Sequence, residues 1–401
     1  MSCLSYTLCA QSITNYTTDE GLPSDVINCL AIDGSGNLWI GTSSGVSIMD
    51  QENWTTLNQA QGTGLVDDNI TTVHVSDYTG LWVGTDFGIC NWNTIEWTCY
   101  DQTNGLENIR INALTSNENG LYIAHKDGFS WLDNAGIIIN YGTDIGLPFG
   151  GVTSIELVND NMVLGLGLGG VAFYNILDEA IFIIDQDEGL INNRVKGLHI
   201  DFINEEVLIA TDGGLSVFNE ADTELINYSS VFELPPPHTL NQLVDVDKDS
   251  EGRIWTGVFI DYLVNVGGIS YQSGEDWISI DVDDGLVSPV VNQIAIDSLD
   301  CVWVATGGGL SKVCLDGSSI KNLVDSDYNM SLFPNPVFDI LTLNLDQSRR
   351  GNISIYNSTM SKVKSERAVT INGSHKLNVS DLISGIYFLE FNGYVSKFIK
   401  S

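Results

Sequence analysis

The feature that most constrains the fold of this chain is a unit that repeats seven times over roughly its first 325 residues. A Gly-Leu pair opens each unit and recurs about every 40 to 50 residues. A short strand led by an aromatic or apolar residue follows each pair, and a glycine opens the next strand. The pairs begin at Gly21, Gly64, Gly105, Gly146, Gly189 and Gly285, with a degenerate copy at Glu233, and the strand-leading residues are Trp39, Trp82, Tyr122, Val163, Leu208, Trp255 and Trp303.

Each unit predicts four short strands separated by Asp, Asn and Gly turns such as residues 33–36, and no helical period of useful length interrupts them. Four strands at this period are typical of a propeller blade. We therefore expect an all-β chain with one closed seven-bladed β-propeller over residues 12–325. The first strand, residues 13–16, is expected to complete the seventh blade, although residues 320–323 compete for the same place.

Composition excludes several classes of partner. The chain carries 52 acidic and 16 basic residues, a formal charge of −36, and such a surface repels nucleic acid and anionic membranes. No apolar run approaches the ~18 residues of a membrane-spanning helix.

The basic residues are unevenly spread along the chain. The last 73 residues hold 8 of the 16 basic residues, so we place a linker at residues 326–330 and a separate module at residues 331–401. We expect a monomer.

The residues of the first unit, Gly21-Leu-Pro-Ser followed by Gly36-Asn-Leu-Trp39-Ile-Gly-Thr-Ser-Ser-Gly45, resemble the two-component regulator propeller repeat. The resemblance covers all seven units, and it is sharp in units one, two and seven. In that family the repeats form periplasmic sensor propellers, which are often fused to a histidine kinase and associated with glycan sensing. No transmembrane helix, kinase or DNA-binding region follows the repeats in this sequence.

The last module predicts short strands in period-two alternation, which form a small Ig-like β-sandwich. Its order of Pro334-Asn-Pro, Ile355-Tyr-Asn, Gly385-Ile-Tyr and a basic last strand resembles the type IX secretion C-terminal sorting domain. That resemblance implies Sec export, handling by the type IX secretion machinery, and a mature protein that is secreted or held on the outer cell surface. Residues 1–11 accordingly read as the remnant of a signal peptide that lacks its charged start, or as a disordered terminus.

Export permits disulfides, and two pairs of cysteines lie symmetrically about hairpin turns: Cys90 with Cys99, and Cys301 with Cys314. Each pair would face across two strands, where a bridge and two buried thiols are both possible. The sequence contains no Cys-x-x-Cys spacing for zinc, and the glycine-rich stretch 165–170 lacks the helix that a dinucleotide site needs. We predict no metal site and no catalytic residue.

One stretch looks like the start of a calcium loop. Asp245, Asp247 and Asp249 alternate as its ligands would, but Ser250 and Thr256 occupy the places of the loop's glycine and glutamate. No cofactor is therefore expected, with calcium as the open alternative. His74 and His199 fall at equivalent places in two inner strands, where they either pack or face the channel.

A ligand is expected at the face where the loop entering each inner strand and the loop between the second and third strands emerge. We call it the acidic loop face, because its entering loops carry residues such as Asp68, Glu188 and Asp284. Unit six departs from the repeat in both of its loops there, and insertions often mark a binding face. The candidate contacts are His238, Phe259, Asp261 and Tyr262 of unit six, with Asn28, Lys196, Asn241 and Asn292 from a ring of polar residues that open the inner strands.

Three functions remain open from the sequence. The first is a secreted or cell-surface binding propeller for a glycan or a protein. The second is an extracellular polysaccharide-active lyase or hydrolase, which would need a positioned base and a charge sink that the sequence offers only in Lys196. The third is a sensor-like propeller that acts in trans with a signalling partner.

Overall fold

The computed structural model describes residues 11–50, 53–62, 64–76, 80–158, 161–219, 223–234, 241–261, 266–315, 330–334, 337–345, 349–357, 362–383, 385–391 and 394–400. The chain divides into two compact units, Met1–Asp316 and Gly317–Ser401. The expected signal-peptide remnant, except Gln11, and the expected linker, except Met330, lie outside the described residues, as does the competing strand at 320–323. No helix among the described residues is long and apolar enough to cross a membrane.

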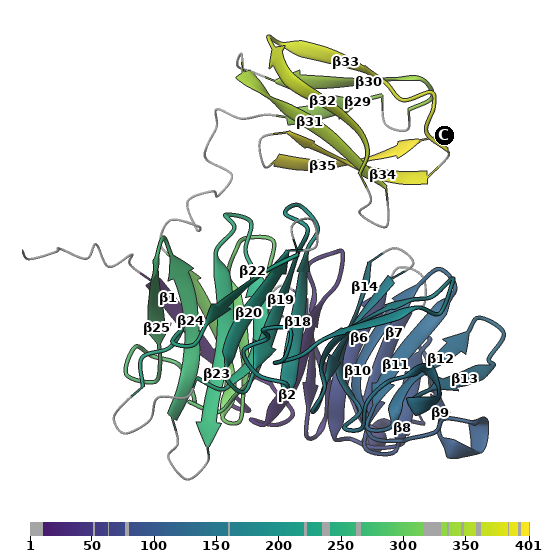
Figure 1. Cartoon of the computed structure of the whole chain (residues 1–401), viewed down its shortest axis with the longest axis vertical. Helices are drawn as coiled ribbons and strands as arrows, with labels where there is room; N and C mark the ends of the chain where they lie inside the picture. The colour runs from purple at the N-terminus through teal and green to yellow at the C-terminus, as the bar shows by residue number, and fades with distance from the viewer. Residues whose placement is uncertain are drawn as a thin grey trace, which may run out of the picture. The chain divides into compact units, whose positions relative to one another are not determined.

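Unit 1 consists of seven four-stranded antiparallel sheets, which Figure 1 shows following one another along the chain from purple to green. Because the side chains of each sheet bury against the next, inner strands of successive blades are in contact, including the last with the first. The first three blades are β2 (Ile27–Ile32), β3 (Leu38–Thr42), β4 (Gly45–Asp50) and β5 (Asn53–Leu57); β6 (Ile70–Ser76), β7 (Gly80–Thr85), β8 (Gly88–Trp92) and β9 (Trp97–Tyr100); and β10 (Ile111–Asn117), β11 (Gly120–His125), β12 (Gly128–Asp133) and β13 (Ile138–Tyr141).

The ring closes through the N-terminal strand. Residues of β1 pair with the third strand of blade seven, in a register that places Tyr16 opposite Leu310, so the expected closure is confirmed. The remaining blades are β14 (Val152–Val158), β15 (Asn161–Leu166), β16 (Gly170–Asn175) and β17 (Ile181–Ile184); β18 (Val195–Asp201), β19 (Glu206–Thr211), β20 (Gly214–Asn219) and β21 (Glu224–Tyr228); β22 (Leu243–Lys248), β23 (Ile254–Asp261), β24 (Val266–Ser273) and β25 (Asp276–Ile280); and β26 (Val291–Ile296), β27 (Val302–Thr306), β28 (Gly309–Leu315) and β1 (Gln11–Tyr16).

Two hydrogen bonds explain why the repeat keeps its tryptophan, threonine and glycine. The indole N–H of Trp39 donates to Asp33 in the preceding turn at 3.0 Å, and Trp255 and Trp303 make the same bond in their blades. The hydroxyl of Thr42 donates to the carbonyl of Gly45 at 2.8 Å. Gly45 itself has a φ of +113°, and a Cβ there would lie 2.5 Å from the carbonyl oxygen of Leu57, so the turn requires glycine.

Unit 2 is a two-sheet β-sandwich. Its core side chains, such as Leu343, Ile355, Leu389 and Phe398, are at most 1% exposed. The three-stranded sheet contains β29 (Met330–Phe333), β30 (Ile340–Leu345) and β33 (Ser374–Asn378), and the four-stranded sheet contains β32 (Lys362–Ile371), β31 (Arg349–Asn357), β34 (Gly385–Phe391) and β35 (Tyr394–Lys400).

Candidate functional site

The expected ring of polar residues lies where each inner strand shifts its register against the second strand of its blade. Most of these side chains donate a hydrogen bond to the backbone of the next blade. The Asn28 amide donates to the carbonyl of Ile70 at 2.8 Å, and the Asn292 amide closes the ring onto Ile27 at 2.7 Å. Thr71, Asn112 and Thr153 make the equivalent bonds. The ring therefore fastens neighbouring blades while it lines the mouth of the central channel.

Two predicted ring members are placed differently. The Lys196 ammonium lies at the mouth but turns to Asp212, 3.7 Å away. In blade six the register assigns the ring position to Val244, and the sequence alignment that put Asn241 there is corrected. Asn241 is 2% exposed, and its side-chain oxygen accepts hydrogen bonds from the backbone N–H groups of Val231 and Phe232. Asn241 thus holds the loop that enters blade six.

The other predicted contacts fall in the insertions of blade six. His238 and Tyr262 lie outside the described residues. Phe259 lies half-buried in β23 opposite Gly267, and Asp261 ends the same strand opposite Val266. The insertion therefore prolongs the hairpin of β23 and β24.

Ionisable side chains gather inside the channel, three residues after the ring position of each inner strand. The strand registers align His74, Glu156, His199 and Asp247 there. The His199 Nδ1 atom lies 2.9 Å from an Asp247 carboxylate oxygen. Burial disfavours the charged imidazole, but this hydrogen bond and the charges of Asp247 and Glu156 outweigh it and raise the pKa of His199.

Two carboxyl groups of the channel have a raised pKa. Burial, reinforced by the charge of Asp247 and opposed by His199, raises the pKa of Glu156 to about 7. Burial also raises the pKa of Asp245 to about 7, although its carboxylate accepts a hydrogen bond from the backbone of Ile294 at 3.1 Å. Glu156 makes no hydrogen bond or salt bridge to any residue that the structure describes. Both side chains line a polar cavity of about 320 Å³ at the mouth.

His74 behaves in the opposite way. Its Nε2 atom lies 2.8 Å from the Ser116 hydroxyl, and burial lowers the pKa of His74 to about 4. The imidazole is therefore neutral at physiological pH and serves as a packed, hydrogen-bonded side chain of the channel wall.

The three aspartates of the calcium-like stretch do not converge. Asp245 and Asp247 bind backbone N–H groups of β26, whereas Asp249 accepts hydrogen bonds from Arg253 and the Trp255 indole in the next turn. The described part of the chain holds no group of three or more His, Cys, Asp or Glu side chains placed to bind a metal ion. Calcium binding stays a prediction.

The cysteines form two disulfides within blades. Cys90 is bonded to Cys99 across β8 and β9, and Cys301 is bonded to Cys314. The fifth described cysteine, Cys29, is free and buried, and burial raises the pKa of its thiol to about 12. Neither the disulfides nor this inert thiol adds chemistry to the channel.

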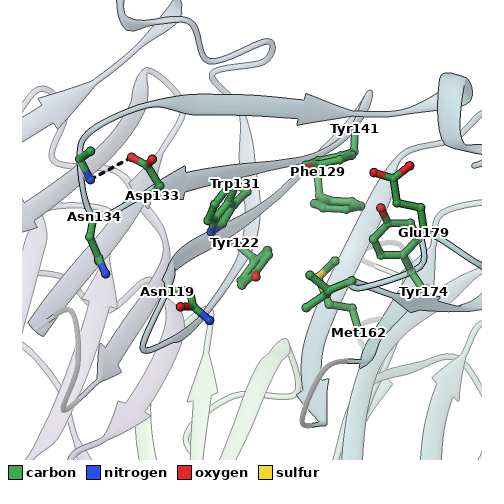
Figure 2. Close-up of a pocket in the computed structure, with 12 residues that line it drawn as sticks. Asn119, Tyr122, Phe129, Trp131, Asp133, Asn134, Tyr141, Met162, Tyr174 and Glu179 are labelled. Carbon is green, nitrogen blue, oxygen red and sulfur yellow. Dashed lines mark hydrogen bonds between the residues drawn. The ribbon is translucent and has the colours of Figure 1, made fainter.

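A second cavity, which the sequence did not predict, lies at the seam between blades three and four. Its volume is about 540 Å³. Figure 2 shows Trp131 and Tyr122 on one side of it, and Phe129, Tyr141, Tyr174 and Met162 on the other. Its rim contains Asn119, Asp133, Asn134 and Glu179, from turns at the strand ends opposite to the acidic loop face. We call it the aromatic cavity; no residue lines both it and the channel cavity.

One sequence signal could have revealed the aromatic cavity. The repeat places an aromatic or apolar residue at the position of Tyr122, and blade three puts a second aromatic residue, Trp131, directly opposite on the neighbouring strand. In blade six the comparable pair, Trp255 and Tyr271, is fully packed at 0% and 5% exposure. In blade three Tyr122 is 4% exposed but Trp131 is only half-buried, and the pair borders the cavity together with Met162 and Tyr174 of blade four.

Comparison with known families agrees with both modules. Residues 331–401 match the secretion system C-terminal sorting domain, and residues 21–44 match the two component regulator propeller. The sorting domain implies a protein that is secreted or held on the outer cell surface, and the propeller carries the two component regulator repeat over residues 21–44. A curated relative, histidine kinase P4 of Formosa agariphila, is 24% identical over 197 residues, which are 46% of this chain and 14% of the kinase.

Similar solved structures share the fold. The extracellular domain of the hybrid two component system BT3049 of B. thetaiotaomicron is 18% identical, with a TM-score of 0.63 over 96% of this chain and 53% of that one. PorZ, a surface component of the type-IX secretion system of Porphyromonas gingivalis, is 14% identical, with a TM-score of 0.61 over 94% of this chain and 60% of PorZ. This chain therefore spans little more than half of these structures and a small part of the kinase.

Proposed function

We propose that this exported propeller is a binding protein that captures a positively charged segment of an extracellular protein partner at the mouth of its central channel. The observation that carries the proposal is the Glu156 carboxyl group, which faces the channel cavity without a hydrogen bond or salt bridge among the described residues. His199 acts on this carboxyl group only through its charge, and an arginine or lysine side chain of a partner would give Glu156 a direct ion pair.

Charge selects the class of ligand. Burial is the main cause of the raised pKa of Glu156 and of Asp245, and repulsion from the charge of Asp247 adds to it in both. A bound cation relieves that repulsion, whereas an anion adds to it. The surrounding acidic loop face also raises the association rate of a basic segment through long-range attraction. Between the glycan and the protein expected from the sequence, this site favours the protein.

Some acidic side chains of the loops accept hydrogen bonds from the loops themselves, which limits their direct contribution to ligand binding. Glu20 accepts hydrogen bonds from the backbone and hydroxyl groups of Thr17 at 2.7 Å, and Asp68 accepts one from the backbone of Gln59 at 2.7 Å. These bonds hold the loops in shape and keep the negative charge at the surface. The loops therefore attract a cation, and the channel provides its specific partner.

The test compares two glutamates with the same charge and different places. Binding of a lysine- and arginine-rich peptide is measured by calorimetry at fixed ionic strength for Glu156→Gln and for Glu224→Gln, which removes an exposed carboxylate on the outer strand β21. We expect Glu156→Gln to weaken binding at least about tenfold and Glu224→Gln to change it less than about twofold. Equal effects of the two variants would show that only net charge attracts the peptide and would overturn the site.

The pair of His199 and Asp247 favours a second candidate, the polysaccharide lyase. A carboxylate hydrogen-bonded at 2.9 Å to one nitrogen of an imidazole orients the ring for proton transfer at the other nitrogen. Incubating the full chain and its His199→Ala variant with polysaccharides tests this candidate. Unsaturated products that depend on His199 would support it, and their absence would remove it. The sensor-like function rests on the resemblance to the histidine kinase relative and stays a prediction.

A further inference from the structure

We propose that the partner segment bound at the channel mouth carries an aromatic or aliphatic side chain near its basic residue, and that this side chain packs on two loops of blade four at the acidic loop face. Phe149 and Leu168 are the side chains that receive it, and we call them the blade-four apolar surface. The inference rests on the proposed function for the place of the basic residue, and it adds a second point of contact.

The loop that enters blade four departs from the repeat at one position. Three residues after the glycine of each Gly-Leu pair, the other five loops carry a polar residue. In four of them its side chain accepts a hydrogen bond of 2.9–3.2 Å from the backbone N–H two residues further on, and these residues are Ser24, Asn108, Asn192 and Ser288. Blade four has Phe149 there, which is 87% exposed and cannot accept such a bond.

The loop between the second and third strands of blade four departs from the repeat as well. In blades one, two, five and seven, a threonine that ends the second strand donates its hydroxyl to the carbonyl of the glycine that opens the third strand. Blade four has Leu166 in place of the threonine, one additional loop residue, and Leu168 with 58% of its surface exposed. In both loops, apolar residues thus replace polar residues that hold the turn in other blades.

The two loops are in contact, so their apolar side chains lie together. The Gly167 N–H donates to the carbonyl of Gly151 at 3.1 Å. A Cβ on Gly150 would lie only 3.0 Å from the Cβ of Leu168, so Leu168 rests against the backbone directly after Phe149. A single exposed apolar side chain is ordinary on a protein surface. Two adjacent ones that replace turn-forming residues of a repeat indicate a contact with another molecule.

The blade-four apolar surface belongs to the same blade as the carboxyl group that the proposed function assigns to the basic residue. Phe149 precedes Glu156 by seven residues, so their Cα atoms lie at most about 25 Å apart. Strand β14 begins at Val152 and brings Glu156 to the channel cavity. An extended segment covers ~3.3 Å per residue. A single partner segment of about seven residues or fewer therefore reaches both contacts.

Charge selects the occupant of this surface. Residues 146–151 and 166–170 contain no charged side chain, whereas entering loops of other blades carry residues such as Asp68, Glu188 and Asp284. An apolar side chain flanked by basic ones is complementary to an uncharged patch within an acidic face. A second copy of this chain would bring another formal charge of −36, and an anionic lipid surface would be repelled in the same way.

Two substitutions remove the blade-four apolar surface without removing a hydrogen bond. Phe149→Ser gives blade four the residue that blades one and seven have at this position, and Leu168→Ser removes an exposed side chain. Leu177→Ser is the matched control. Leu177 is 75% exposed and lies between β16 and β17 of the same blade, at the strand ends opposite to the acidic loop face.

The experiment compares lysine- and arginine-rich peptides that differ at one residue. The variable residue, tryptophan or alanine, is placed roughly two to six residues from a central arginine, and calorimetry gives both Kd values for the full chain. We expect tryptophan to tighten binding at least about fivefold at one or more spacings. Phe149→Ser and Leu168→Ser should each reduce this gain to less than about twofold, whereas Leu177→Ser should keep it.

The outcomes separate this inference from the proposed function. Glu156→Gln should weaken both peptides and leave the gain from tryptophan intact. A gain that is absent at every spacing, or that Phe149→Ser and Leu168→Ser do not reduce, would overturn the blade-four apolar surface whatever Glu156→Gln does. If Glu156→Gln has no effect while Phe149→Ser removes the gain, the channel function fails and the surface stands. A dimer of the full chain that Phe149→Ser dissociates in sedimentation would assign the surface to a second copy and overturn the inference.

Discussion

The channel mouth and the aromatic cavity belong to one propeller but are built in opposite ways. The channel gathers the same strand position from every blade, and most of its polar side chains already bind a neighbouring blade. The aromatic cavity arises at a single seam, from residues of two blades. The repeated positions therefore build the scaffold, whereas the cavity depends on residues that differ from blade to blade.

The largest expected effect tests whether an ion pair between blades five and six stabilises the propeller. Lys248 of blade six bridges Asp201 and Glu206 of blade five, and the Lys248 and Asp201 side chains are 10% and 8% exposed. Lys248→Met would leave a buried carboxylate without its partner. We expect it to lower the free energy of unfolding by about 3 kcal/mol or more.

This loss can be measured by urea unfolding followed by tryptophan fluorescence, because all 9 tryptophans lie before residue 317 and report the propeller alone. Lys196→Ala serves as the control, since its ammonium is 40% exposed and 3.7 Å from Asp212. A Lys248→Met propeller as stable as the control would show that the bridge does not fasten the blades.

The second largest effect on stability distinguishes Asn241 from Asn292, which the sequence placed in one ring. Asn241→Ala leaves the buried N–H groups of Val231 and Phe232 without an acceptor, and we expect a loss of about 2 kcal/mol. Asn292→Ala removes one bond between blades, from a half-buried side chain, and we expect a loss of about 1 kcal/mol. The same fluorescence assay compares them, and a larger loss for Asn292→Ala would reverse their assigned roles.

A third effect depends on pH and concerns the channel carboxyl groups. Burial raises the pKa of Glu156 above its value in the unfolded chain, so its contribution to stability is intact below about pH 4 and is lost as the pH rises through 7. Glu156→Gln should therefore stabilise the propeller at pH 8, by about 1–3 kcal/mol, and have little effect at pH 4.

Unfolding of both proteins at the two pH values measures the difference, with Glu224→Gln as the control on the outer strand. A gain of equal size at pH 4 and pH 8 would mean that packing, and not the charge of Glu156, causes it.

Much of the fold could be predicted from the sequence, because the same structural signals recur in successive blades. The Trp39 position holds tryptophan in four of the seven units, and its indole donates to an aspartate of the preceding turn in blades one, six and seven. The Gly45 position holds glycine in all seven units and has a left-handed φ in six of them. Blade six departs from the repeat. Its register shift falls between Leu243 and Asp245, so Val244 lies at the ring position and Asp247 joins Glu156 and His199, whereas alignment by residue type had selected Asn241.

The aromatic cavity could not be predicted for a different reason. Its members are ordinary strand residues in the sequence, and only the packing of blade three against blade four brings Trp131, Met162 and Tyr174 to the border of one cavity. A repeat alignment compares equivalent positions in different blades, while this cavity depends on non-equivalent positions across one seam.

Peptide binding at two ionic strengths tests most sharply whether the channel mouth holds a specific partner for a positive charge. The lysine- and arginine-rich peptide is titrated by calorimetry into the full chain, into Glu156→Gln and into Glu224→Gln. We expect Glu156→Gln to weaken binding at least about tenfold at both ionic strengths and Glu224→Gln to change it less than about twofold. Equal losses in the two variants, or a difference that disappears at the higher ionic strength, would mean that only net charge attracts the peptide.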